Sequence, residues 1–120
     1  MQSPKEVVLA YVEATGAGDF TTARKLLNDN LEFRGPFDTF HKADDLVHAL
    51  EKLHAIVERI DVKKVFEDGN EVGVFCDLVT KPLGPSFVAE WYQVKGGKIA
   101  SIRIVFDARP FAAMFSKPAG

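Results

Sequence analysis

Cysteine is nearly absent from this sequence: among its 120 residues only Cys76 carries a thiol. A single thiol can form neither an internal disulfide nor a cysteine zinc site, which excludes a disulfide-stapled secreted scaffold. Long apolar runs are missing too, since no stretch approaches the roughly 20 residues that a membrane-spanning helix needs. The N-terminus lacks a basic segment followed by an apolar one. We therefore expect a cytoplasmic protein with no membrane partner.

The charged residues show no excess of one sign. Lys and Arg number 15 against 17 Asp and Glu, the formal net charge is −2, and no basic cluster is interleaved with aromatic residues. This balance argues against a nucleic-acid partner. The hydrophobic fraction of 47% is ordinary for a folded protein, and 120 residues suffice for one core but not for two. We expect a single domain over residues 1–120.

The stretch from Ser86 to Phe106 predicts an antiparallel hairpin, because two runs rich in β-branched and aromatic residues flank a glycine-centred turn. Alternate side chains of a strand face opposite sides. One side of the first run carries Val88, Glu90, Tyr92 and Val94, and the other carries Phe87, Ala89, Trp91 and Gln93. Both sides hold large apolar groups, so we expect helices to cover one and a second subunit to cover the other.

Helical signals come early in the chain. Ser3–Pro4–Lys5–Glu6 has the pattern of a capping box, and Gly16–Ala17–Gly18 marks the end of the helix that it opens. Asp19 is placed to cap a second short helix. A third helix is expected with Asp44 or Asp45 as its cap and an apolar stripe that continues to Ile56 and Val57.

Strand signals fill the rest of the chain. They predict strands over 31–34, 60–66 and 72–80, a loop over 38–42 and a connection over 81–85 before the hairpin. Helices followed by an antiparallel meander predict an α+β domain with helices on one face of the sheet. The tail after Phe106 is expected to form a helical turn that plugs one end of a cavity.

Three segments of this chain resemble one family of proteins: 11–19, with Tyr11 at its start and Gly18–Asp19 at its end, Gly97–Lys98–Ile99, and Val105–Phe106–Asp107. The chain resembles the SnoaL-like proteins, which include polyketide cyclases, and the ketosteroid isomerases of the nuclear-transport-factor-2-like (NTF2-like) superfamily. The resemblance spans nearly the whole chain. It implies a cone-shaped fold with a strongly bent antiparallel sheet and the N-terminal helices on its concave face. The superfamily hosts enzymes, binding modules and assembly domains alike.

The resemblance also implies catalytic positions. Tyr11 falls where ketosteroid isomerases place the tyrosine of the oxyanion hole, and Glu90 falls where they place its protonated acid partner. The isomerase base corresponds to Gly35 here, so the nearest acid inside the predicted mouth loop, Asp38, is one candidate base. The other is Asp107, close to the aspartate that SnoaL-type cyclases carry near the end of the last long strand.

These residues predict an apolar pocket for a small lipophilic, carbonyl-bearing molecule, and the resemblance implies cofactor-independent proton transfer of the isomerase or cyclase type in that pocket. Beside the four candidate catalytic residues, the predicted ligand contacts are Phe33, His41, Leu78, Val88, Tyr92, Ile102, Ile104 and Phe106. No metal site is predicted, because His48 and His54 do not share a helix face, and the implied proton transfer needs no cofactor. Cys76 is expected to be inert packing. The other sheet face is predicted to form a homodimer through Phe75, Val79, Phe87, Trp91 and Val105, with Asp77 and Arg103 as a cross-strand or intersubunit ion pair.

Each candidate has a structural alternative. Glu90 also fits a rim carboxylate that pairs with Lys or Arg, and Tyr11 also fits a core tyrosine. Asp107 also fits a turn or cap residue for the tail, and His41 a solvated loop residue. The function that competes with proton transfer beside a carbonyl is a non-catalytic small-molecule-binding or assembly module.

Overall fold

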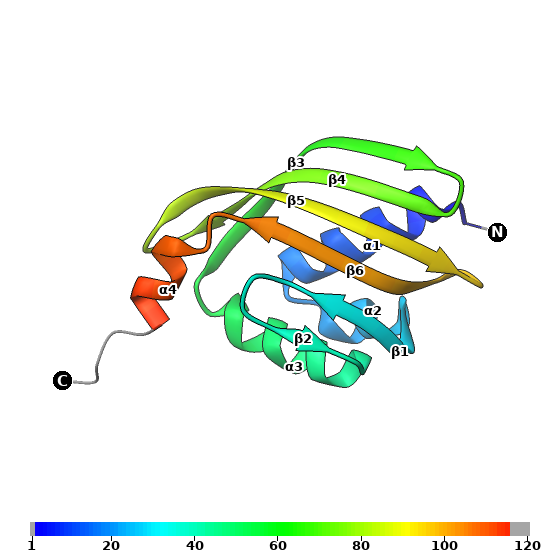
Figure 1. The fold of residues 1–120 in the computed structure, drawn as a ribbon, viewed down its shortest axis with the longest axis horizontal. Coiled ribbons are helices and arrows are strands. Elements are labelled where there is room, and N and C mark those ends of the chain that lie inside the picture. The colour runs from blue at the N-terminus through cyan, green and yellow to red at the C-terminus, as the bar shows by residue number, and fades with distance from the viewer. Residues whose placement is uncertain (1, 116–120) are drawn as a thin grey trace.

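A strongly curved sheet wraps around the helices in the computed structural model, which describes residues 2–115 (Figure 1). The helices are α1 (Pro4–Ala17), α2 (Phe20–Lys25), α3 (Ala43–His54) and α4 (Arg109–Phe115). The strands are β1 (Leu27–Arg34), β2 (Thr39–Phe40), β3 (Val57–Asp68), β4 (Glu71–Thr80), β5 (Gly84–Lys95) and β6 (Lys98–Phe106). The predicted α+β class is confirmed; the ends of the predicted 1–120 domain, Met1 and 116–120, lie outside the described residues.

The sheet has the strand order β2-β1-β6-β5-β4-β3. Strands β3 to β6 form the predicted antiparallel meander, and β1 is antiparallel to β2. One pair departs from the antiparallel pattern, because β1 runs parallel to β6. These two strands are far apart in the sequence, and hairpin signals inform only about neighbours along the chain.

The β5–β6 hairpin fixes which side chains face the helices. Gly96 and Gly97 have positive φ angles of 59° and 77°, as a two-residue turn of type I′ requires. On β5, Tyr92 is only 1% exposed whereas its neighbour Trp91 is 46% exposed. The alternation read from the sequence is therefore confirmed.

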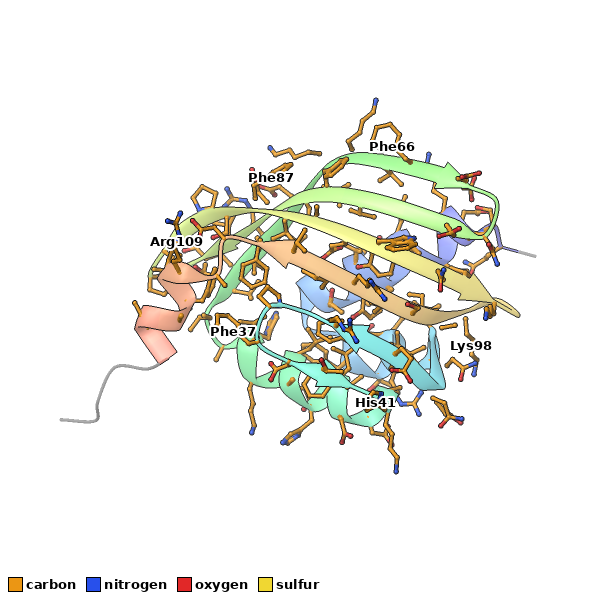
Figure 2. The ribbon with its side chains drawn as sticks, viewed as in Figure 1. Phe37, His41, Phe66, Phe87, Lys98 and Arg109 are labelled. Carbon is orange, nitrogen blue, oxygen red and sulfur yellow. The ribbon has the colours of Figure 1, made fainter. Side chains whose placement is uncertain are left out.

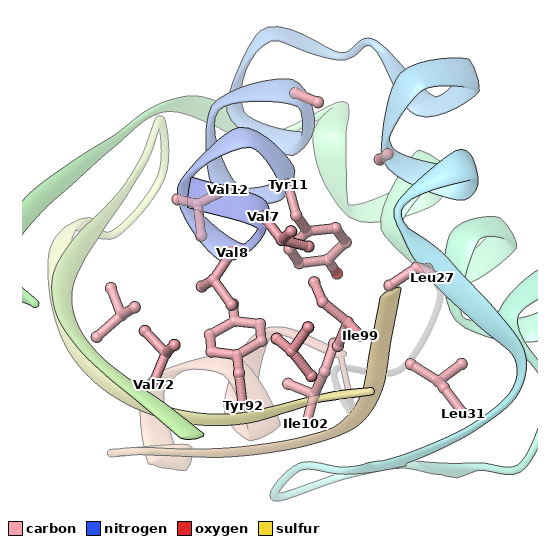
Figure 3. Close-up of a cluster of buried hydrophobic side chains, with 14 of the residues drawn as sticks. Val7, Val8, Tyr11, Val12, Leu27, Leu31, Val72, Tyr92, Ile99 and Ile102 are labelled. Carbon is pink, nitrogen blue, oxygen red and sulfur yellow. The ribbon is translucent and has the colours of Figure 1, made fainter. Parts of the chain in front are cut away.

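Helix α1 supplies the layer that covers the concave face. Its capping box is present: Ser3 Oγ accepts a hydrogen bond from the Glu6 amide at 3.2 Å, and Glu6 Oε1 accepts one from the Ser3 amide at 3.0 Å. Val8 and Tyr11 pack with Tyr92 and Ile102 of the sheet in a buried cluster (Figure 3). No helix in the described part of the chain is long and apolar enough to cross a membrane.

Helix α3 differs from its prediction at both ends. Neither acid caps it, since Lys42 holds the cap position without a side-chain hydrogen bond, and Asp44 instead accepts one from Arg24 Nε at 2.7 Å. The helix ends at His54 because strand pairing takes over: the Ile56 carbonyl accepts from the Lys81 amide at 2.9 Å, and Val57 already pairs with β4.

The convex outer face of the sheet divides into two halves. One half, here called the apolar half, carries Phe66, Phe75, Phe87 and Val105; Figure 2 shows Phe66 and Phe87 projecting from it. Phe75 stacks on Phe87 with ring centroids 5.9 Å apart. Val79 does not join this surface, because it is 6% exposed and belongs to the protein's own interior.

The other half, here called the polar half, contains Arg103. The predicted ion pair between Asp77 and Arg103 is not formed within the described chain. Strand β5 lies between their strands, so Asp77 instead reaches Lys63 at 3.7 Å and the Arg103 guanidinium lies over the Trp91 ring at 5.6 Å.

Candidate functional site

A cavity of about 430 Å³ lies between the concave face of the sheet and the helices. Its walls come from the four helices α1 to α4, the 35–38 loop and the six strands β1 to β6, and they are predominantly apolar. Cavities of a few hundred Å³ with apolar walls and a few polar groups are typical small-molecule sites. This cavity is therefore the candidate site.

Most of the residues predicted for the site line this cavity. They are Tyr11, Phe33, Asp38, Leu78, Val88, Glu90, Tyr92, Ile104 and Phe106. Strand alternation alone predicted which side chains of β4, β5 and β6 line the cavity, because residues two apart on a strand share a face. His41, Ile102 and Asp107 are not among the lining residues.

Glu90 is the charged group of the cavity's β-sheet wall. Its Oε1 accepts a hydrogen bond of 2.7 Å from the Tyr92 hydroxyl, and within residues 2–115 it forms no ion pair with Lys or Arg. Burial raises the pKa of Glu90 from 4.5 to about 7, and the Tyr92 hydrogen bond, which favours the charged form, limits that rise. Glu90 therefore populates both protonation states near neutral pH.

Tyr11 approaches the same region from α1. Its ring meets that of Tyr92 edge to face, with centroids 5.9 Å apart, and Figure 3 shows both side chains in the space between α1 and β5. The Tyr11 side chain is buried, and its hydroxyl makes no hydrogen bond to another residue of the described chain. Burial, and then the nearby Glu90, raise the pKa of Tyr11 above its ordinary value. Tyr11 thus keeps its proton and can donate it to a ligand oxygen.

Cys76 is a cavity-lining residue that the sequence interpretation assigned to packing alone. It pairs with Val88 in the sheet, one inward-facing position away from Glu90. Burial, with a smaller contribution from Glu90, raises the pKa of this thiol to about 12. A thiol that stays protonated at neutral pH is a poor nucleophile, which supports the expected inert role.

The two candidate bases occupy different environments. Asp38 lines the cavity from the loop after β1 and is exposed. Asp107 accepts three hydrogen bonds from Arg109: from its amide at 3.1 Å, from Nε at 2.9 Å and from a terminal guanidinium nitrogen at 2.7 Å. These bonds lower the pKa of Asp107 to about 2. Asp107 thus fits the turn role at the start of α4 and makes a weak proton acceptor.

His41 and Ile102 lie elsewhere for separate reasons. Phe40 pairs with Phe33 and faces the cavity, so the next residue, His41, turns outward, where its Nδ1 lies 2.6 Å from Glu32 Oε2. Ile102 does face the helices, but it is 1% exposed and packs in the hydrophobic cluster rather than on the cavity wall (Figure 3).

Aromatic residues that the sequence interpretation did not assign to ligand contact form one end of the cavity. Phe111 of α4 is 2% exposed and meets Phe106 edge to face at 5.3 Å, which agrees with the expected plug by the tail. Phe37 also meets Phe106, with ring centroids 6.2 Å apart, and lies beside the end of β6 (Figure 2).

Leu46, Leu50 and Leu53 of α3 add to the cavity wall. The apolar stripe of α3 was the signal available for these leucines.

Metal ligation has no candidate in this region. Among residues 2–115, no three side chains of His, Cys, Asp or Glu converge in a way that would hold a metal ion. Tyr11, Glu90, Tyr92 and Asp38 are the polar lining residues that the sequence predicted, and Thr15, Lys52 and His54 line the cavity as well.

A family model described as a SnoaL-like domain matches residues 8–102. No curated protein matches the sequence.

Solved structures share the fold over most of the chain. An NTF2-like protein of unknown function from Cytophaga hutchinsonii is 27% identical, with a TM-score of 0.81 over 92% of this chain and 96% of its own. A protein from Kribbella flavida is 27% identical, with a TM-score of 0.85 over 92% and 91%. An LEH-like epoxide hydrolase from M. tuberculosis shares the fold at 22% identity, with a TM-score of 0.75 over 93% and 94%.

Proposed function

Because the chain belongs to the SnoaL-like domain family, we propose that its cavity binds a small lipophilic carbonyl compound and transfers a proton beside the carbonyl without a cofactor. The observation that carries this proposal is the pairing of Glu90 with Tyr92 in a cavity that also presents the free hydroxyl of Tyr11. A cavity with apolar walls and a few polar groups suits an apolar ligand that bears one polar function.

Tyr11 holds the carbonyl oxygen in this proposal. Its hydroxyl has no protein acceptor within the described chain and keeps its proton, so it donates a hydrogen bond to the ligand oxygen. When a proton leaves the adjacent carbon, negative charge develops on that oxygen as an enolate forms. A fixed donor in an apolar cavity stabilises this charge more than water does.

Glu90 accepts and returns the proton. Its Oε1 is held by Tyr92, which leaves Oε2 to face the ligand. A base buried in an apolar cavity is best matched to neutral pH when its pKa lies near 7, and burial brings the pKa of Glu90 to about 7. The charged carboxylate takes the proton from the carbon beside the carbonyl. In a β,γ-unsaturated ketone the anion formed is a dienolate, and the resulting acid returns the proton to its γ carbon while the double bond shifts into conjugation, which balances the reaction as an isomerisation.

A second assignment of roles uses Asp38. Here neutral Glu90 joins Tyr11 as a donor to the enolate oxygen, and Asp38 at the exposed part of the cavity removes the proton. The two assignments predict opposite pH profiles. With Glu90 as base, kcat/KM rises as the pH increases through about 7; with Glu90 as a neutral donor, it falls through the same range.

The test is hydrogen exchange into lipophilic ketones. Purified protein is incubated in D₂O with a panel of cyclic and steroid-like ketones, and loss of the α-proton signals is followed by NMR. Glu90→Gln should slow the exchange by about 100-fold or more, and Tyr11→Phe by about 10-fold or more. Glu13→Gln, an exposed change on α1, serves as the control. Exchange at the buffer rate for every ketone that binds would overturn the proposal.

The competing function is a non-catalytic binding module. It is favoured by Gly35, which stands where the resemblance places the isomerase base, and by the exposed position of Asp38. In this case ketones raise the melting temperature by mass action but exchange no protons.

We also propose a homodimer through the apolar half of the outer face. Phe66, Phe87 and Val105 are 54%, 61% and 65% exposed, and the Phe75 ring links Phe66 and Phe87, with centroids 6.0 and 5.9 Å away. A contiguous patch of this kind on a monomer is typical of a protein interface.

A further inference from the structure

The polar half of the outer face contains a shallow hollow of about 150 Å³ between β1, β2 and β6. Its polar lining residues are Glu32, Arg34, Thr39, Ser101 and Arg103. Its polar side chains alternate with Phe33, Phe40 and Ile104, which face the large cavity, so the hollow opens on the other side of the sheet, and Phe33 borders both spaces. Any ligand of this hollow is therefore separate from the reaction proposed above.

Two arginines stand side by side in this hollow. Arg34 of β1 and Arg103 of β6 are register partners on parallel strands. Their neighbours Phe33 and Ile104 face the cavity, so both arginines point to the outer face. Two like charges directly opposite each other on a sheet repel unless an anion lies between them.

Neither arginine is neutralised by the described part of the chain. The other three arginines, Arg24, Arg59 and Arg109, each pair with a carboxylate within 4.0 Å. Within residues 2–115, Arg34 and Arg103 have no ion pair and no side-chain hydrogen bond. The donors of both guanidinium groups are therefore available.

The surroundings hold one of these groups in place. The Arg103 guanidinium lies 5.6 Å from the centre of the Trp91 ring, and Trp91 Nε1 donates a 2.7 Å hydrogen bond to Glu71. This contact orients the guanidinium before any anion arrives, which reduces the entropy lost on binding. The one acid in the hollow, Glu32, has its Oε2 2.6 Å from His41 Nδ1.

We propose that Arg34 and Arg103 bind a small oxyanion, the phosphate or carboxylate group of a small molecule, in the hollow between β1 and β6. Guanidinium groups match the planar spacing of carboxylate and phosphate oxygens and can donate two parallel bonds each. The hydroxyls of Ser101 and Thr39 line the same hollow and supply further donors. The negative charge of the anion offsets the repulsion between the two arginines. Its oxygens accept hydrogen bonds from both guanidinium groups.

The test is an NMR titration of the arginine side-chain Nε–Hε signals. Inorganic phosphate and acetate are the two probes, and sodium chloride keeps the ionic strength constant, since exposed charges are strongly screened. Saturable shifts of the Arg34 and Arg103 signals are expected. The probe that binds with the higher affinity shows whether phosphate or carboxylate is the preferred group.

Matched variants separate a built site from general attraction of anions. Arg34→Gln and Arg103→Gln should each weaken phosphate binding by about tenfold, because each removes charge-assisted hydrogen bonds. Arg59→Gln removes the same charge from β3, outside the hollow, and should change the affinity less than about twofold. Equal weakening by all three variants, or shifts that never saturate, would overturn the proposal. A different result would also overturn it: the parent protein binds no phosphate, and Arg34→Glu changes the oligomeric state. That result would mean that a second copy of the chain covers the hollow.

Discussion

The Tyr92 hydroxyl donates a 2.7 Å hydrogen bond to the carboxylate of Glu90, two positions before it on the same strand. Side chains two apart on β5 share the concave face, so the strand itself brings the pair together. The bond holds a carboxyl group inside an apolar cavity and moderates the effect of burial on its pKa.

The stability of the fold should fall as the pH rises from 4.5 to about 7. In this range the folded protein keeps the Glu90 proton whereas the unfolded chain has released it, so the unfolded state binds fewer protons and stability decreases with pH. The loss amounts to at most about 3 kcal/mol. Urea denaturation at several pH values measures it, and Glu90→Gln should abolish it while Glu13→Gln should not.

Tyr92→Phe should raise the pKa of Glu90 further. The variant removes the hydrogen bond that favours the charged carboxylate and leaves the desolvation by burial in place. Titration of the Glu90 carboxyl carbon by ¹³C NMR gives the value directly. Tyr11→Phe is the matched control, because Tyr11 makes no hydrogen bond to Glu90, and it should leave this pKa nearly unchanged. An unaltered pKa in Tyr92→Phe would show that the bond is absent in solution.

Phenolate ligands should bind more weakly to Tyr11→Phe than to the parent protein, by about 1–3 kcal/mol, because the ligand oxyanion loses its donor. Isothermal titration calorimetry with phenols of graded acidity measures the difference. The methyl ether of the same phenol carries no oxyanion, so its binding free energy should change little in Tyr11→Phe. A loss of equal size for the ether would assign the effect to altered packing.

Phe87→Glu should shift the protein toward monomers in sedimentation velocity at micromolar concentration. The side chain is 61% exposed in the apolar half, where its ring stacks on Phe75, and a charge there would be buried without a partner in the dimer. Thr21→Glu makes the same change of charge on the exposed side of α2 and should have no effect. A parent protein that is already monomeric would refute the homodimer.

Gly18→Ala should destabilise the fold by about 1–2 kcal/mol, since an alanine at positive φ is strained. Gly18 has a φ of 77°, and an added Cβ would lie 2.8 Å from Cε1 of His54. Gly16→Ala is the control. There φ is not positive, the nearest atom lies 3.6 Å away, and alanine favours the helix by up to about 1 kcal/mol. Thermal unfolding followed by circular dichroism should separate the two variants clearly.

The local part of the site could be predicted from the sequence, because alternation along β5 placed Val88, Glu90 and Tyr92 on one face. The capping box at Ser3 and the glycine turn at Gly96 were equally local signals. Each of these patterns predicts how residues a few positions apart are placed relative to one another. The structure contains both the capping box and the hairpin that the patterns predicted.

The remainder depended on contacts that no local pattern encodes. His41 turned outward because the pairing of β2 with β1 aims Phe40 at the cavity. Asp107 does not line the cavity because its carboxylate is hydrogen-bonded to Arg109, and the start of α4 places Arg109 there. The apparent extension of α3 to Val57 failed because strand pairing with β4 outweighed helical periodicity.

The parallel pairing of β1 with β6 has a consequence for biosynthesis. Leu27 and Leu31 of β1 are fully buried in the finished protein, yet β1 leaves the ribosome long before β6. Until then its one neighbour in the sheet is the two-residue strand β2. The nascent chain therefore carries an open strand edge with apolar side chains, a state that attracts chaperones and favours aggregation. Since β6 joins β1 to the meander, the domain completes its fold only after nearly the whole chain has been synthesised.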